Sequence, residues 1–275
     1  MGVPDTHVIS FIGENPCEID GAVISAIQHS NVMTPLNHQI TVHRSFSNKP
    51  PGGYPNYYEK VKRYATIISA PAKFLDSSVT ERTFKVIPDI ENETVFQYID
   101  TNSSRAQIEF INSKLAGEKI AVIGLGGTGA YVLDLIAKTP VKEIHIFDGD
   151  SFDQHNAFRS PGAATLSDLE ENLRKVEYYH RLYSNMHRFI YPHDCYIKWE
   201  NLMELTNMTY VFVCVDKNPV RKLITDFLVS KGIPFSDVGL GVNVVEDRLM
   251  GMVRVTSATN SKSDHLPLRI FPEDS

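Results

Sequence analysis

The chain has 275 residues, of which 42% are hydrophobic and 22% are charged, and its formal net charge is −6 at pH 7. This length and composition predict a globular protein with one large core or two modest ones, and they exclude a disordered chain. The acidic balance argues against nonspecific binding of nucleic acid, and no apolar run approaches the roughly 18 residues of a membrane helix.

The cysteines and the N-terminus indicate the compartment. Three cysteines lie far apart in the sequence, at positions 17, 195 and 214, and an odd, scattered set does not suggest a disulfide framework. No secretory signal is evident at the N-terminus. We therefore expect a cytoplasmic protein that does not enter a membrane.

The first 100 residues predict a small α+β domain, to which the residues alone assign no role. Ile40 and Val42 alternate with polar neighbours as in a half-buried strand, whereas Val61, Tyr64 and Ile68 recur at helical spacing. The acidic and polar segment from Asp89 to Ser104 has few apolar anchors and is expected to be a linker.

Residues 104–275 alternate strands and helices and predict a Rossmann-like α/β domain, with a mostly parallel sheet and helices on both faces. The expected strands are Lys119–Ile123, Glu143–Phe147 and Thr209–Val215, with one later strand at Met250–Thr256. The expected helices are Gly127–Lys138 and Leu166–Met186.

A glycine-rich turn follows the first of these strands. Gly124, Gly126 and Gly129 form a G-x-G-x-x-G pattern, with Gly127 beside them, and this pattern opens a helix whose N-terminus favours phosphate. Asp148 ends the next strand, 24 residues after Gly124, where a carboxylate would accept hydrogen bonds from ribose hydroxyls. This much would fit an NAD-binding oxidoreductase as well as an ATP-binding enzyme.

The continuation separates the two interpretations, because an NAD enzyme has no evident need for so many polar groups after the strand. The D-x-D-x5-N-x2-R pattern consists of Asp148, Asp150, Asn156 and Arg159. With the glycine turn, it resembles the ThiF/MoeB and ubiquitin-activating-enzyme superfamily. Two later segments resemble that superfamily in the same order: Arg174–Glu177, and Cys214–Asp216 followed by Arg221.

This resemblance implies a site for ATP and Mg²⁺. Asp148 would hold the ribose, Arg159 and Lys175 would neutralise phosphate oxygens, and Asn156 would donate to one of them. Asp216 would bind magnesium, with Asp150 as a weaker candidate, because a hard cation between phosphates takes one or two carboxylates. Asp216 could instead cap the helix that Asn218–Pro219 would start. The two C-x-x-C pairs that hold structural zinc in many relatives are missing, so no structural zinc is expected.

The resemblance further implies adenylation of a carboxylate, most often the C-terminus of a ubiquitin-like protein, by a homodimer. The runs FSNKP and GYPNYYEKV also resemble an uncharacterised domain that precedes ThiF-type modules in bacterial proteins. The chain stops about 54 residues after Arg221, where relatives usually continue. A truncated, nucleotide-binding module without turnover is therefore the alternative hypothesis, and an NAD-dependent oxidoreductase is the outsider.

Overall fold

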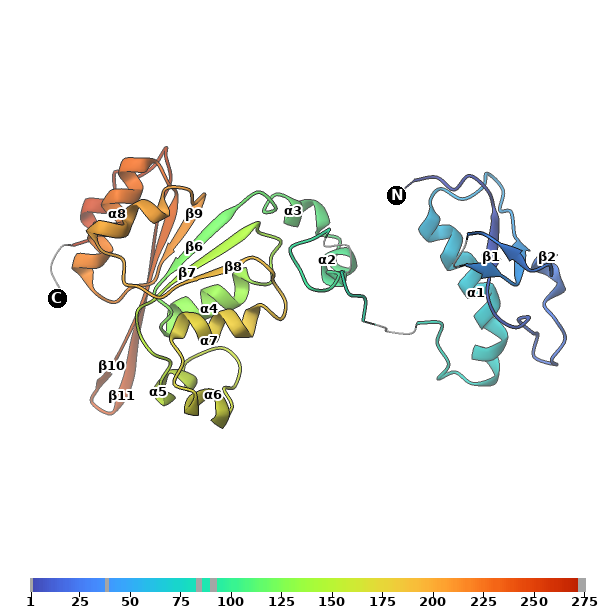
Figure 1. Cartoon of the computed structure of the whole chain (residues 1–275), viewed down its shortest axis with the longest axis horizontal. Helices are drawn as coiled ribbons and strands as arrows, with labels where there is room; N and C mark the ends of the chain where they lie inside the picture. Colours follow the sequence, from blue (N-terminus) through green and yellow to red (C-terminus); the bar gives the residue numbers. More distant parts are fainter. Residues whose placement is uncertain (1, 38–39, 83–85, 90–92, 272–275) are drawn as a thin grey trace. The chain divides into compact units, whose positions relative to one another are not determined.

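The computed structural model describes residues 2–37, 40–82, 86–89 and 93–271 (Figure 1). The chain divides into two compact units, Met1–Lys85 and Val86–Ser275. None of the helices among the described residues is long and apolar enough to cross a membrane.

The first unit is a small antiparallel sheet with one long helix. Its three-stranded sheet has the order β1-β5-β2, and a two-stranded sheet joins β3 and β4. The elements are β1 (Val8–Phe11), η1 (Ser25–Ile27), β2 (Gln28–Ser30), β3 (Thr34–Pro35), β4 (Thr41–Val42), β5 (Arg44–Ser47) and α1 (Tyr57–Leu75). Tyr64 of α1 is buried against Phe46 and Ile27, and its hydroxyl donates to His7 O at 2.7 Å. The expected α+β character of this region is confirmed.

The segment expected to be a linker packs within the second unit. Arg188 donates to Asp89 Oδ2 at 2.8 Å and also to Asp89 O, while Thr94 donates to the same carboxylate. Two short helices follow, α2 (Thr101–Ala106) and α3 (Glu109–Ser113). Contacts to Arg188, almost 100 positions away, could not be read from the local composition.

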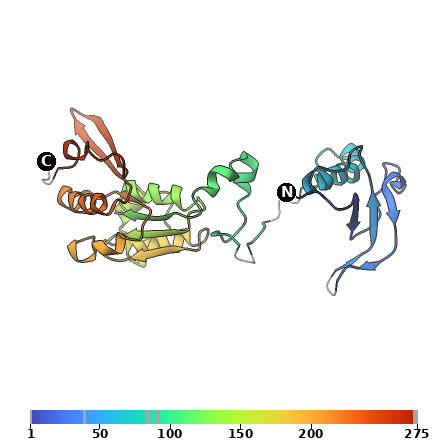
Figure 2. The ribbon, with the colours of Figure 1, turned by 90° about the horizontal axis from the view of Figure 1, so that it is seen from above.

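The second unit is a six-stranded sheet with the order β11-β10-β9-β6-β7-β8 (Figures 1 and 2). All neighbours are parallel except β10 and β11. The strands are β6 (Lys119–Ile123), β7 (Glu143–Phe147), β8 (Ile190–His193), β9 (Tyr210–Val213), β10 (Phe235–Val245) and β11 (Arg248–Ala258). The helices are α4 (Gly127–Ile136), α5 (Gln154–Ala157), α6 (Leu166–Glu170), α7 (Lys175–Tyr183) and α8 (Asn218–Lys231), with η2 (Trp199–Leu205) and η3 (Leu266–Leu268).

Both faces of the parallel strands are covered, because alternate residues of a strand point to opposite faces. Ile120 and Val122 of β6 pack with Leu133 of α4 and Val176 of α7. Ala121 and Ile123, which alternate with them along the strand, pack instead with residues of α8 and η2. The Rossmann-like α/β fold with helices on both faces is thus confirmed.

The single helix expected from Leu166 to Met186 is wrong. The structure has α6 and α7 instead, separated at Asn172, which has φ of 51°. The break arises from pairing with a distant turn: Phe152 N donates to Leu173 O at 2.8 Å, and Lys175 N donates to Asp150 O at 2.9 Å. This pairing brings the start of α7 to the carboxyl end of β7.

Strands β10 and β11 form a ribbon that continues beyond the neighbouring strands in Figure 1. β9 pairs with β10 only over Phe235–Asp237, whereas β10 and β11 pair along their full length. A two-residue turn, Glu246–Asp247, joins them, and both of its residues have positive φ, as a tight hairpin requires. The expected strand at Met250–Thr256 lies within β11.

Candidate functional site

The glycine turn joins β6 to α4 at the carboxyl edge of the sheet. Gly124 has φ of +88°, and a Cβ there would lie 2.8 Å from Cys214 O. A Cβ on Gly129 would lie 1.8 Å from Gly124 O, so only glycine lets the helix approach the turn this closely. A Cβ on Gly126 would meet nothing within 4 Å. Gly124 and Gly129 therefore serve packing, while the backbone at Gly126 is open to a ligand.

Asp148 fastens the end of β7 to this turn. Its carboxylate is buried, with Oδ2 accepting from Leu125 N at 2.7 Å and Oδ1 accepting from Asp150 N at 2.8 Å. Each oxygen keeps a further lone pair, so these bonds do not prevent contact with ribose hydroxyls. They do give Asp148 a role in shaping the glycine turn, which the sequence pattern alone did not reveal.

Lys175 is a buried cation of the site and lies at the first position of α7. The residue is only 5% exposed, and its Nζ lies 2.7 Å from Asp150 Oδ2 and 3.7 Å from Asp148 Oδ1. The hydrogen bond from Lys175 is the main cause that lowers the pKa of the Asp150 carboxyl, and a second bond, from Tyr196, adds to it. Lys175 is thus brought to two carboxylates that lie 25 and 27 positions earlier in the sequence.

The side chains of Arg159 and Asn156 differ in burial and in their hydrogen-bond partners. Asn156 is buried, and its side-chain oxygen accepts from Asp153 N at 2.9 Å to close the capping box of α5. Arg159 is exposed, and a Cβ on Gly127 would lie 3.7 Å from its Cδ. Among the residues that the structure describes, the Arg159 guanidinium has no hydrogen-bond or ion-pair partner. It is therefore an available cation beside the start of α4.

Asp216 follows β9 and is exposed. The N-cap of α8 is Lys217, so the capping role considered for Asp216 is not the one in the structure. Across the described ranges, no group of three or more His, Cys, Asp or Glu residues could hold a metal by itself. A magnesium ion between phosphates needs only one or two carboxylates. Asp216 fits that requirement better than Asp150, whose two oxygens accept from Lys175 and Tyr196.

Arg221 holds the turn that carries Asp216. It is buried, with Nε donating to Asp237 Oδ1 at 2.7 Å and Nη2 donating to Val215 O. Arg254 Nη2 lies 3.0 Å from the other oxygen of Asp237. Arg221, which resembles the arginine of the superfamily's last motif, therefore maintains the shape of the site. Burial raises the pKa of the nearby Cys214 thiol to about 12, which argues against a nucleophilic role.

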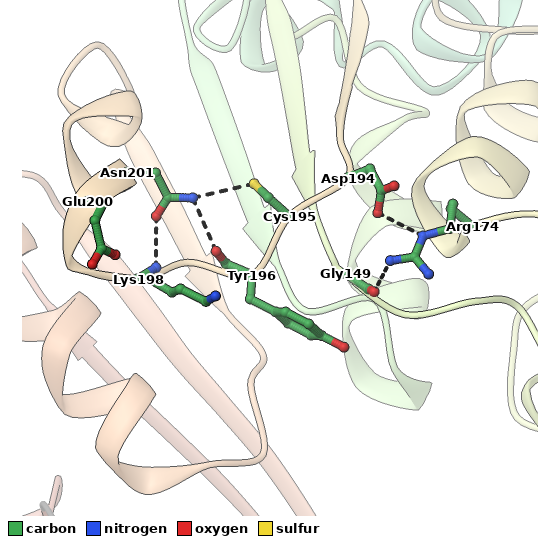
Figure 3. Close-up of a pocket in the computed structure, with 8 residues that line it drawn as sticks. All are labelled: Gly149, Arg174, Asp194, Cys195, Tyr196, Lys198, Glu200 and Asn201. Atoms are coloured by element: carbon green, nitrogen blue, oxygen red, sulfur yellow. Dashed lines mark hydrogen bonds and ion pairs between the residues drawn. The ribbon is translucent and has the colours of Figure 1, made fainter.

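A cavity of about 330 Å³ lies near Asp150, between Gly149 and the loop after β8 (Figure 3). Its lining includes Gly149, Arg174, Asp194, Cys195, Tyr196 and Asn201. Arg174 donates to Asp194 Oδ1 at 2.8 Å and to Gly149 O, and Tyr196 donates to Asp150 Oδ1. Tyr196 was not among the residues predicted from the sequence. The available signal was its place shortly after a parallel strand, at the edge where ligands bind.

Comparison with solved structures found similar folds at low sequence identity. TcdA, the Escherichia coli tRNA N6-threonylcarbamoyladenosine dehydratase, shares 18% identity, with a TM-score of 0.44 over 51% of this chain and 63% of that chain, and has been solved with AMP and with ATP. E. coli MccB, solved with AMPCPP and MccA, shares 18% identity, with a TM-score of 0.46 over 70% of this chain and 55% of that one. This chain thus spans less than two thirds of their lengths.

Comparison with curated proteins gave no match. Two family models match this chain, and the two matches meet at residue 101. Residues 2–101 match a domain of unknown function, DUF6791. Residues 101–262, more than half of the chain, match the ThiF family model, and this match covers every residue of the site described above. The chain therefore belongs to the ThiF family.

Proposed function

We propose that the second unit binds ATP with Mg²⁺ at the glycine turn and adenylates a carboxylate. The observation that carries this proposal is the charge arrangement at the turn. A buried ammonium, Lys175, and an exposed guanidinium without a partner, Arg159, flank a helix N-terminus whose backbone at Gly126 is open. Such groups favour a polyanion. A dinucleotide dehydrogenase would not require two cations at this point.

The chemistry needs positioning more than a protein nucleophile. An oxygen of the acceptor carboxylate attacks the α-phosphorus, the bond to the bridging oxygen of pyrophosphate breaks, and an acyl-adenylate and pyrophosphate form. Arg159 and Lys175 would stabilise the charge that develops on the phosphate oxygens, which is the main requirement of such a transition state. Mg²⁺ held by Asp216 would neutralise charge on the departing pyrophosphate.

The acceptor is the finer part of the proposal. Membership of the ThiF family supports the C-terminus of a ubiquitin-like protein, bound by a homodimer in the cytoplasm. TcdA and MccB, which are named for a tRNA and crystallised with MccA respectively, point to RNA-borne and peptide carboxylates as the acceptors to test beside it.

Calorimetric titration with ATP and MgCl₂ tests the nucleotide site. Arg159→Ala is expected to weaken ATP binding by about tenfold or more, because a charge-assisted phosphate contact is lost. Asp216→Ala is expected to remove the difference between MgCl₂ and EDTA. The matched controls are Arg181→Ala and Asp226→Ala, which remove exposed charges paired on the surfaces of α7 and α8 and should bind ATP as the wild type does.

Three outcomes decide among the candidate functions. Pyrophosphate exchange that depends on a ubiquitin-like protein would establish the full proposal. Magnesium-dependent ATP binding without exchange, for every acceptor class above, would support a nucleotide-binding module without turnover. Tighter binding of NAD than of ATP would contradict the proposal and favour an oxidoreductase.

A further inference from the structure

Tyr196 reaches the phosphate side of the site from a separate part of the chain. It lies in the loop after β8, and Figure 3 shows its side chain extending from that loop on the side of Gly149. A Cβ on Gly149 would lie 2.7 Å from the tyrosine ring, so a residue without a side chain is needed beneath it. The ring is thereby seated, and the hydroxyl donates a hydrogen bond to Asp150 Oδ1.

Asp150 connects this hydroxyl to the buried lysine. Its other oxygen, Oδ2, accepts from Lys175 Nζ at 2.7 Å, whereas the next carboxylate oxygen, on Asp148, is 3.7 Å from the same nitrogen. Asp150 is therefore the principal partner of Lys175. The Asp150 side chain is half exposed, so water competes for it unless a second donor fixes its orientation.

We propose that Tyr196 is a positioning residue of the nucleotide site, which orients Asp150 so that Asp150 in turn holds the Lys175 ammonium beside the glycine turn. This inference rests on the proposed function. An ammonium has three donors, so Lys175 can keep its bond to Asp150 and still donate to phosphate oxygens. Tyr196 would thus raise affinity for ATP without touching it, by removing alternative orientations of the lysine before the ligand arrives.

The test is Tyr196→Phe, which removes the hydroxyl and keeps the ring over Gly149. ATP binding with MgCl₂ is expected to weaken about threefold to tenfold, less than for the loss of a direct hydrogen bond to a charged group, because Tyr196 acts on the ligand only through Asp150 and Lys175. Tyr191→Phe is the matched control, because Tyr191 is also an exposed tyrosine, lies within β8 itself, and its hydroxyl bonds to no described residue. Because Tyr196 is 55% exposed, the variant should unfold at the wild-type temperature.

Two further readouts separate positioning from direct contact. In an Asp150→Asn background the additional Tyr196→Phe change should have little effect, because the connection to Lys175 is already altered. The pH profile should also move. Tyr196 helps to keep the pKa of Asp150 low, so the loss of ATP affinity on acidification should begin at a higher pH in Tyr196→Phe.

Each outcome is decisive. If the wild type binds ATP and Tyr196→Phe binds it equally well, the role of Tyr196 is overturned while the proposed function stands. An equal loss of affinity in the Asp150→Asn background would show that the hydroxyl contacts the nucleotide itself, which also overturns positioning. If the wild type does not bind ATP, the proposed function fails and this inference fails with it.

Discussion

The covered part of the six-stranded sheet and its projecting ribbon have similarly apolar sequences but different surroundings. In β9, Val211 and Val213 are fully buried between the helix layers. In the ribbon, residues directly opposite each other across β10 and β11 create an equally apolar face that is largely exposed. That face contains Val238, Leu240, Val242, Val244, Leu249, Val253 and Val255.

The difference between these regions shows that apolar strands alone do not define a core. Strands β6, β7 and β9 are buried because α4, α7, α8 and η2 cover them. At the carboxyl edge of the same strands, α7 begins with Lys175, and Asp216 follows the end of β9. The ribbon lies past the last parallel pairing, at Asp237, and among the described residues of the second unit no helix covers its outer part. Tight packing and the candidate site therefore occur in the same half of the sheet.

The largest effect is expected from one substitution made in both regions. Gly129→Ala would place a Cβ 1.8 Å from Gly124 O and should cost more than about 3 kcal/mol of unfolding free energy, because neither backbone can move freely. Gly241→Ala in the ribbon meets nothing within 4 Å and should change stability by less than about 1 kcal/mol. Urea unfolding measures both. Equal losses of stability in the two variants would contradict the difference in packing between the covered half of the sheet and the ribbon.

A third glycine sharpens this test within the site itself. Gly126→Ala also meets nothing within 4 Å, so the chain should remain as stable as the wild type. If phosphate approaches the backbone there, the added methyl group should weaken ATP binding by about tenfold or more. Unchanged ATP affinity would place the phosphates elsewhere.

The covered half of the sheet could be predicted closely from the sequence. The bounds of β6 and β7 agree with the expected strands, because each is a short apolar run that ends at a turn signal, Gly124 or Asp148. By contrast, β10 was not predicted. Gly239, Gly241 and Asn243 interrupt its apolar pattern, and its pairing with β11 becomes evident only in the structure.

Site residues could be named from the sequence, but their connections could not. The sequence pattern predicted Lys175, Asp148 and Asp150 as site residues. The helix break before α7, which places Lys175 in the site, depends on hydrogen bonds to the turn at Asp150 and Phe152. The same tertiary pairing made the expected long helix wrong. Nucleotide contact by these residues stays a prediction until it is measured.

A smaller effect is expected from replacing valine by threonine in each region. Val213→Thr would bury a hydroxyl in β9 and should cost about 1–3 kcal/mol, because the buried group loses its hydrogen bonds to water. Val253→Thr changes a ribbon residue that is 70% exposed and should alter stability by less than about 0.5 kcal/mol. Urea midpoints of the two variants, compared with the wild type, test this. A destabilised Val253→Thr would mean that the ribbon face is covered in solution.

The smallest effect is a pH dependence that belongs to the covered half alone, since the ribbon contains no histidine. His187 is fully buried; its Nε2 donates to Val141 O at 2.9 Å, and its Nδ1 accepts from Phe189 N at 3.2 Å, an arrangement that only the neutral ring can make. Burial accordingly lowers its pKa.

Above the unfolded-state pKa of about 6.5 the ring is neutral in both states and costs nothing. As the pH falls below that value, the unfolded chain binds the proton first, so the free energy of unfolding should decrease. Urea midpoints between pH 7.5 and 5.5 should therefore fall in the wild type and fall less steeply in His187→Gln, with His155→Gln, an exposed α5 residue, as the control that keeps the wild-type slope. Parallel slopes in all three chains would show that the buried ring is not the source of the pH dependence.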